Sequence, residues 1–133
     1  MPANGQTNIF NLGNVAPQIA AFFGDNSLYS TTSQFNPTYA SAITLDTTAA
    51  GCFFLTTTSA VGNTTLTPST INPAGHQLQV LILGDASASR TITFGTGFLS
   101  TGTLATVTSK TVVIDFTSNG TAYVETGRQS TGV

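Results

Sequence analysis

A period of two in hydrophobicity runs through this chain from Ala42 onward and constrains its fold more than any other feature. Successive side chains on a strand point to opposite faces of a sheet, so this period predicts strands with one buried face. The runs typical of strands are AITLD (42–46), CFFLTTT (52–58), QLQVLIL (77–83), RTITF (90–94), TLATV (103–107), TVVIDFT (111–117) and TAYVE (121–125). With turn residues between them, they predict an all-β, jelly-roll-like sandwich or barrel of about eight short strands.

One hairpin and one central strand are predicted most clearly. Asn119-Gly120 separates the last two runs, and this dipeptide favours a two-residue type I′ turn. That turn would place Ser118 opposite Thr121, Phe116 opposite Tyr123 and Ile114 opposite Glu125, with Asp115 on the other face. The run 77–83 starts with strict alternation and ends fully apolar, which indicates a central strand.

The first 39 residues differ from this pattern. Residues 1–39 are rich in Asn, Gln, Ser and Pro, and their apolar side chains are scattered. We therefore divide the chain into an extended N-terminal arm (1–39), used for assembly or attachment, and a β-body (40–133). A short helix of about two turns is predicted in the arm, between Pro17 and Gly24. The apolar side chains expected to bind a partner are Ile9, Phe10, Leu12, Val15, Ile19, Phe22 and Phe23.

Charged residues make up only 6% of the chain, against roughly 25% in an ordinary soluble domain. Only Arg90, Lys110 and Arg128 are basic, which argues against nucleic-acid binding. No run of about 18 apolar residues is present, so we expect no membrane-spanning segment. A surface without charge is soluble when Thr hydroxyls coat it or when an assembly covers it, and this composition favours a β-rich assembly protein.

The sequence offers few groups for catalysis, and we expect no catalytic residue, cofactor or metal. His76 precedes a strand in a turn and is interpreted as a loop histidine, while Cys52 follows Gly51 in an apolar strand and is interpreted as a buried structural cysteine. A Cys52–His76 pair would be the alternative nucleophile and base. An isopeptide bond from Lys110 to an Asn, assisted by Glu125 or Asp115, is a further alternative.

The carboxylates do not form a predicted acid–base pair either. Asp25, Asp46 and Asp85 lie beside turns or at a strand end, where Asp commonly caps the backbone. Asp115 and Glu125 are predicted on opposite faces, so they would not converge as a glycosidase pair. The Gly95–Gly102 segment is glycine-rich, but strands flank it and no helix N-terminus is predicted there to bind phosphate.

About 55 residues of the C-terminal half resemble a β-module of tailed-bacteriophage virion proteins. The motifs that carry this resemblance are PAGHQLQVLIL (73–83), RTITFGTGF (90–98), GTL (102–104) and KTVVIDFTSNGTAYVE (110–125). Such modules occur in capsid cement (decoration) proteins and in head or tail fibre tips. This chain has Tyr123 where such modules often have Trp, and its arm matches no part of them.

The resemblance implies a non-enzymatic structural protein of the virion. The favoured hypothesis is a cement protein, a homotrimer that binds the major capsid protein at the capsid surface after assembly in the host cytoplasm. The arm would attach the protein to the capsid. Because a symmetric oligomer presents several arms, contacts that are weak individually would together be strong. The alternative is a fibre tip that binds a host-surface glycan or receptor through loops such as Gly95–Gly102. A hydrolase on a β-scaffold is the third and least favoured hypothesis.

Overall fold

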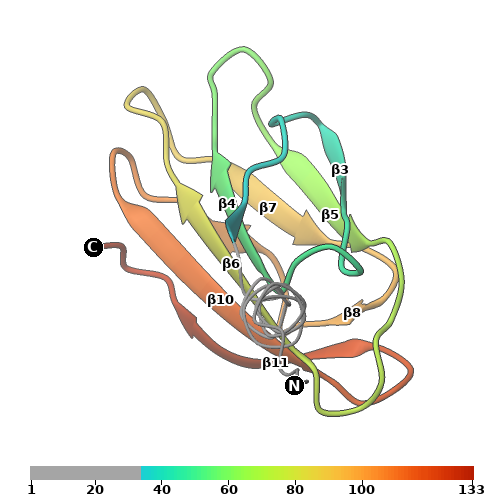
Figure 1. Cartoon of the computed structure of the whole chain (residues 1–133). Coiled ribbons are helices and arrows are strands. Elements are labelled where there is room, and N and C mark those ends of the chain that lie inside the picture. Colours follow the sequence, from blue (N-terminus) through green and yellow to red (C-terminus); the bar gives the residue numbers. More distant parts are fainter. Residues whose placement is uncertain (1–33) are drawn as a thin grey trace, which may run out of the picture. The chain divides into compact units, whose positions relative to one another are not determined.

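The computed structural model describes residues 34–133, and these form two sheets and no helix. The larger sheet has six strands in the order β2 (Gln34–Phe35), β4 (Cys52–Thr56), β6 (Gln77–Leu83), β10 (Thr111–Ser118), β11 (Tyr123–Gln129) and β8 (Phe98–Leu99). The smaller sheet has four strands in the order β3 (Ala42–Leu45), β5 (Thr64–Pro68), β7 (Thr91–Phe94) and β9 (Leu104–Ala105). The two sheets form two layers (Figure 1). The predicted all-β class is confirmed, and of the predicted sandwich or barrel the structure shows two separate sheets.

The chain passes from one sheet to the other at almost every connection. Each strand from β3 to β10 lies in the opposite sheet from the strand before it. Because the chain winds in this way, strands two apart become neighbours, and the pairs β2–β4, β4–β6, β3–β5 and β5–β7 are all parallel. A jelly roll is built from antiparallel strands. The part of the body from β2 to β7 is therefore wound like a solenoid, and the predicted jelly roll does not describe how its strands pair.

The core lies between the two sheets and follows the predicted period of two. Every second residue of β10, from Val112 to Ser118, is buried. The run 77–83 forms β6, which lies between β4 and β10, so the central-strand prediction is confirmed. The largest side chains with essentially no exposed surface are Tyr123, Phe53, Phe116, Leu45, Leu55, Leu66, Leu78, Ile82, Ile92, Leu104, Ile114 and Val80.

Four threonines are buried among these apolar side chains. The hydroxyl groups of Thr47, Thr57 and Thr64 donate to the carbonyl oxygens of Thr70, Leu83 and Ala40, at 2.7, 3.2 and 2.5 Å respectively. The Thr106 hydroxyl accepts a hydrogen bond from the backbone N–H of Arg90. A buried hydroxyl is tolerated when it is hydrogen-bonded. The hydroxyl groups of these threonines therefore cross-link segments that lie far apart in the sequence.

The β10–β11 hairpin is confirmed, but its predicted turn is wrong. Ser118 pairs with Tyr123, so the loop contains Asn119–Ala122 rather than two residues. A type I′ turn needs a positive φ at both central positions, and here only Gly120 has one, at 95°. The Asn119 side chain instead accepts hydrogen bonds from the backbone N–H groups of Thr121 and Ala122, which closes the wider loop.

The longer loop shifts the register of the hairpin. Phe116 pairs with Glu125 and Ile114 with Arg128, and a bulge lies between Asp115 and Phe116. The predicted cross-strand pair of Phe116 and Tyr123 is therefore wrong in register, although both rings are buried. The Phe98 ring packs against both, with centroids 4.6 Å from Phe116 and 6.0 Å from Tyr123.

Three strands were not predicted. β5 lies between two predicted turn regions, β8 lies within the Gly-rich segment, and β2 lies in the segment assigned to the arm. Tyr39 also contributes to the core, and its hydroxyl donates to the Gly62 carbonyl oxygen at 2.7 Å. The compact unit formed by the described residues begins at Gln34. The helix predicted between Pro17 and Gly24 lies outside the described residues.

Candidate interaction surface

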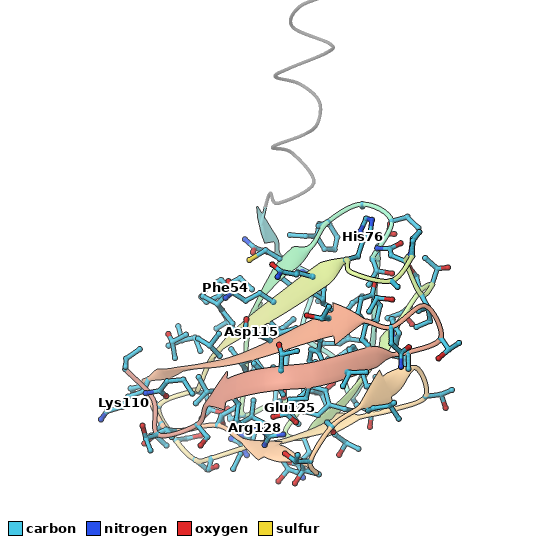
Figure 2. The ribbon with its side chains drawn as sticks, turned by 90° about the horizontal axis from the view of Figure 1, so that it is seen from below. Phe54, His76, Lys110, Asp115, Glu125 and Arg128 are labelled. Carbon is cyan, nitrogen blue, oxygen red and sulfur yellow. The ribbon has the colours of Figure 1, made fainter. Side chains whose placement is uncertain are left out.

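The outer face of the six-stranded sheet carries a row of apolar side chains. Phe54 on β4 is the neighbour of Leu81 on β6, and Leu81 is the neighbour of Val113 on β10. Leu83 lies two residues further along β6 on the same face. All four side chains are half-buried, and Figure 2 shows Phe54 on this side of the body. We call Phe54, Leu81, Leu83 and Val113 the apolar row.

A polar row runs beside it across the same strands. Cys52, Gln79 and Asp115 are neighbours on β4, β6 and β10. The Gln79 side-chain amide donates to the Asp115 carboxylate at 2.9 Å, and the Cys52 Sγ lies 3.9 Å from Gln79 Oε1. Asp115, labelled in Figure 2, is thus held by a neutral partner. It is the one charged side chain of this row.

Cys52 faces outward and is half-buried, so the prediction of a buried structural cysteine is wrong. Its place follows from the phase of β4, because Phe53 and Leu55 take the two inward positions. Partial burial raises the pKa of the Cys52 thiol, and the negative charge of Asp115 raises it further. A thiol is nucleophilic as the thiolate, so these surroundings oppose nucleophilic catalysis by Cys52.

The outer face of the four-stranded sheet carries small, uncharged side chains. Ala42, Thr65 and Thr93 follow one another across β3, β5 and β7, and Thr44 is the neighbour of Thr67. On the other flank Thr91 is the neighbour of Ala105. No charged residue occupies these outward positions of the described sheet. Threonine is suited to this place because its branched Cβ fits a pleated sheet and its hydroxyl is hydrated.

Four charged side chains form two ion pairs in loops and at sheet edges. The Arg90 Nε donates to Asp85 Oδ2 at 2.6 Å, while Asp85 Oδ1 accepts from the backbone N–H groups of Ser87 and Ala88. The Arg90 guanidinium and the Ser87 hydroxyl hold the pKa of Asp85 well below its ordinary range. Asp46 caps its own turn through Thr48, and this hydrogen bond lowers its pKa. These carboxylates order turns, as predicted from their positions.

The second ion pair holds the β8–β9 loop against β11. Glu125, with only 8% of its side chain exposed, accepts from Arg128 Nε at 2.5 Å and from the Thr101 backbone N–H at 2.8 Å. Arg128 also donates to the Thr103 carbonyl oxygen at 2.9 Å. Figure 2 shows the two labelled side chains side by side. The hydrogen bond from Arg128 is the main reason that the pKa of Glu125 falls to about 2.

Replacing Glu125 with Gln should loosen this loop. We expect Glu125→Gln to lower the free energy of unfolding by about 1.5–3 kcal/mol, since Arg128 loses its charged partner. Folding depresses the pKa of Glu125 from 4.5 to about 2, so its stabilising effect is complete above pH 4.5 and is lost as the pH falls toward 2. Urea unfolding of both proteins at neutral and acidic pH measures this. A difference in the free energy of unfolding between the two proteins that stays constant down to pH 2 would contradict this prediction.

The remaining candidates for chemistry do not come together. Asp115 and Glu125 lie on opposite faces of the hairpin, as predicted, because their partners are Gly127 and Phe116. His76 and Lys110 are exposed and immediately precede β6 and β10, which are antiparallel, so they lie at opposite ends of that pair. An isopeptide bond in the core would need a buried lysine, so the exposed Lys110 does not fit it. Within residues 34–133 no group of three His, Cys, Asp or Glu side chains could hold a metal ion.

The predicted partner-binding residues of the arm lie outside the described residues. They are Ile9, Phe10, Leu12, Val15, Ile19, Phe22 and Phe23. Sequence reasoning missed the apolar row, although the fully apolar end of the run 77–83 was a signal for it. We used that run only to predict a central strand, whereas its Leu81 and Leu83 also face outward and are half-buried.

Comparisons with known proteins add no family to this description. The chain matches no protein-family model, and the search of curated proteins finds no relative. Over the part of the chain that the structure describes, no helix is long and apolar enough to cross a membrane.

Proposed function

We propose that this chain is a non-enzymatic structural protein of a tailed-bacteriophage virion, a capsid cement protein that binds the assembled head as an oligomer. The observation that carries the proposal is the distribution of charge over the described body. Four charged side chains are paired with each other in loops and at an edge, which leaves two broad sheet faces nearly neutral. Faces of this kind suit burial against other protein surfaces and offer no acid–base pair for turnover.

The outer face of the six-stranded sheet is the proposed contact between copies. The apolar row spans three adjacent strands, and strands in a sheet lie about 4.8 Å apart, so its side chains form one continuous patch. Two copies can approach through this face with little like-charge repulsion, because Asp115 is the one carboxylate among the two rows. Cyclic symmetry would close the assembly, and we favour a trimer.

A charge placed in the apolar row should break this contact. We expect Leu81→Lys to convert the purified oligomer to monomers while the melting temperature of the body changes little, because Leu81 is already half-exposed. Light scattering after gel filtration measures the mass. Thr93→Lys, on the outer face of the smaller sheet, is the matched control and should leave the oligomer intact. If both variants keep the native mass, the apolar row is not the contact.

Attachment to the head is assigned to the arm. Its apolar side chains would act as anchors on the major capsid protein, and an oligomer would present several arms at once, so that avidity strengthens each contact. The direct test is co-sedimentation of the full-length protein with undecorated shells of the phage that encodes it. Saturable binding with added shell stability supports the proposal, and no binding at any protein concentration refutes it.

A fibre tip that binds a glycan or receptor is the second candidate. Leu99 favours it, because this side chain is 56% exposed on a short edge strand next to the loop that Glu125 and Arg128 hold in place. A fixed loop with an exposed apolar tip is typical of recognition sites. The number of copies per virion distinguishes the two roles, because cement covers the shell whereas fibre tips are few.

A further inference from the structure

The loop that joins β10 and β11 holds the side chain of Asn119 in an unusual arrangement. Asn119 Oδ1 accepts three hydrogen bonds, from the Thr121 backbone N–H, the Thr121 hydroxyl and the Ala122 backbone N–H, each at 2.9 Å. Donors aimed at a carbonyl oxygen stabilise the negative charge that develops there when a nucleophile attacks its carbon. The side-chain amide of Asn119 is therefore activated toward attack.

The nearest backbone nucleophile is the amide nitrogen of Gly120. The hydrogen bond from the Thr121 N–H to Asn119 Oδ1 folds the Asn119 side chain back along its own backbone. Asn119 Cγ and the Gly120 nitrogen therefore belong to one hydrogen-bonded ring. The Gly120 N–H donates to the Ser118 hydroxyl oxygen at 3.0 Å, and this hydrogen bond polarises the N–H bond from which the proton is lost. Gly120 has no side chain to hinder the approach and is exposed, with φ at 95°.

We propose that Asn119 is a site of intramolecular deamidation. The Gly120 nitrogen forms a bond to Asn119 Cγ as hydroxide from solvent removes its N–H proton. The Cγ–Nδ2 bond then breaks, and a proton from water lets the leaving nitrogen depart as ammonia. The product is a five-membered succinimide. Water adds to either of its carbonyl carbons and opens the ring to aspartate or to isoaspartate, so the atoms balance without any oxidant or reductant.

The other asparagines of the described body lack this arrangement. Asn36 and Asn72 precede prolines, whose nitrogen carries no hydrogen and cannot form the ring. Asn63 precedes Thr64, whose branched and buried side chain hinders the approach of the Thr64 nitrogen to Asn63 Cγ. Within residues 34–133 we therefore expect conversion at Asn119 alone.

Deamidation would alter the hairpin. An isoaspartate adds a methylene group to the backbone and moves the side-chain oxygens away from the donors of Thr121 and Ala122. It also adds one negative charge to a chain whose net charge is −2. The loop that closes the confirmed hairpin would then lose the three hydrogen bonds that hold it, and aged protein would differ from fresh protein in charge and in stability.

The experiment is to age the full-length protein in mildly alkaline buffer made with water that carries a heavy oxygen isotope. The aged protein is then digested with trypsin. Cleavage after Lys110 and Arg128 releases peptide 111–128, whose only side-chain amide is that of Asn119. We expect this peptide to gain the mass of an amide-to-acid conversion, with one heavy oxygen from water, and to contain isoaspartate.

Two variants separate the proposed activation from simple exposure. Thr121→Val removes the hydroxyl donor and should slow conversion by about tenfold. Thr126→Val, a change of the same kind at an exposed residue of the same peptide, should leave the rate unchanged. Circular dichroism confirms that both variants are folded. The proposal is overturned if peptide 111–128 stays unmodified while unfolded chain converts, or if Thr121→Val converts as fast as the native protein.

Discussion

Replacing Phe116 with Ala should lower the free energy of unfolding by about 3–5 kcal/mol, the usual cost of truncating a fully buried Phe. Only 1% of Phe116 is exposed, and its ring lies 5.4 Å from that of Phe94 and 4.6 Å from that of Phe98, centroid to centroid. Phe94 and Phe98 come from the two different sheets, so the cavity would open at the junction of the layers. Equilibrium unfolding in urea measures the change.

Phe54→Ala is the matched control for this prediction. Phe54 also lies on the six-stranded sheet, but on its outer face, where the side chain is half-exposed. We expect Phe54→Ala to cost the isolated body less than about 1.5 kcal/mol, because little packed surface is lost. Equal costs for the two variants would mean that the inner and outer faces are assigned wrongly.

A protein shortened to residues 34–133 should fold but should no longer bind capsid shells. The shortened chain keeps β2 and the buried Tyr39, so the described core remains complete. It lacks every apolar side chain to which we assign attachment, among them Phe10, Ile19 and Phe22. Co-sedimentation with undecorated shells measures the loss, and the expected decrease is from saturable binding to the background level.

Full-length protein with Phe22→Ser and Phe23→Ser is the control for this truncation. It changes two anchors and leaves the chain length and the charge unaltered, so a loss of binding would point to the side chains themselves. Shells that bind the shortened protein as well as the full chain would show that the body, and not the arm, makes the contact.

The faces of the strands could be predicted from the sequence because a period of two depends only on local backbone geometry. The alternation in 77–83 and 111–117 holds in the structure, where Val80, Ile82 and Ile114 are all buried. The same reasoning put Asp115 and Glu125 on opposite faces. The Asn-Gly signal located the hairpin correctly, although it did not determine the length of the loop.

The pairing of the strands could not be predicted in the same way. Alternation states which face of a strand is buried but not which strand is its neighbour, and the only pair predicted from the sequence was the hairpin at Asn119-Gly120. Here the connections cross between layers, so Phe53 lies beside Val80 in a parallel pair. β5 was missed because a Thr-rich run ending in Pro68 contains Leu66 as its one large apolar side chain.

The ion pair of Glu125 and Arg128 could not be predicted from the sequence for a related reason. In a regular strand, residues three apart point to opposite faces, so the period of two separates these side chains. The bulge opposite Asp115 and Phe116 leaves Thr126 unpaired, and this extra residue turns Arg128 to the same side as Glu125. A bulge has no sequence signal here, so the structure was needed to find the contact that fixes the β8–β9 loop.

Counting the copies of this chain in purified virions tests the proposed role most directly. Quantitative mass spectrometry against the major capsid protein gives the ratio. We predict many copies per particle, in a fixed proportion to the copies of the major capsid protein, because a cement protein covers the whole shell. A handful of copies per particle, or absence from the virion, would contradict the assignment to the capsid surface.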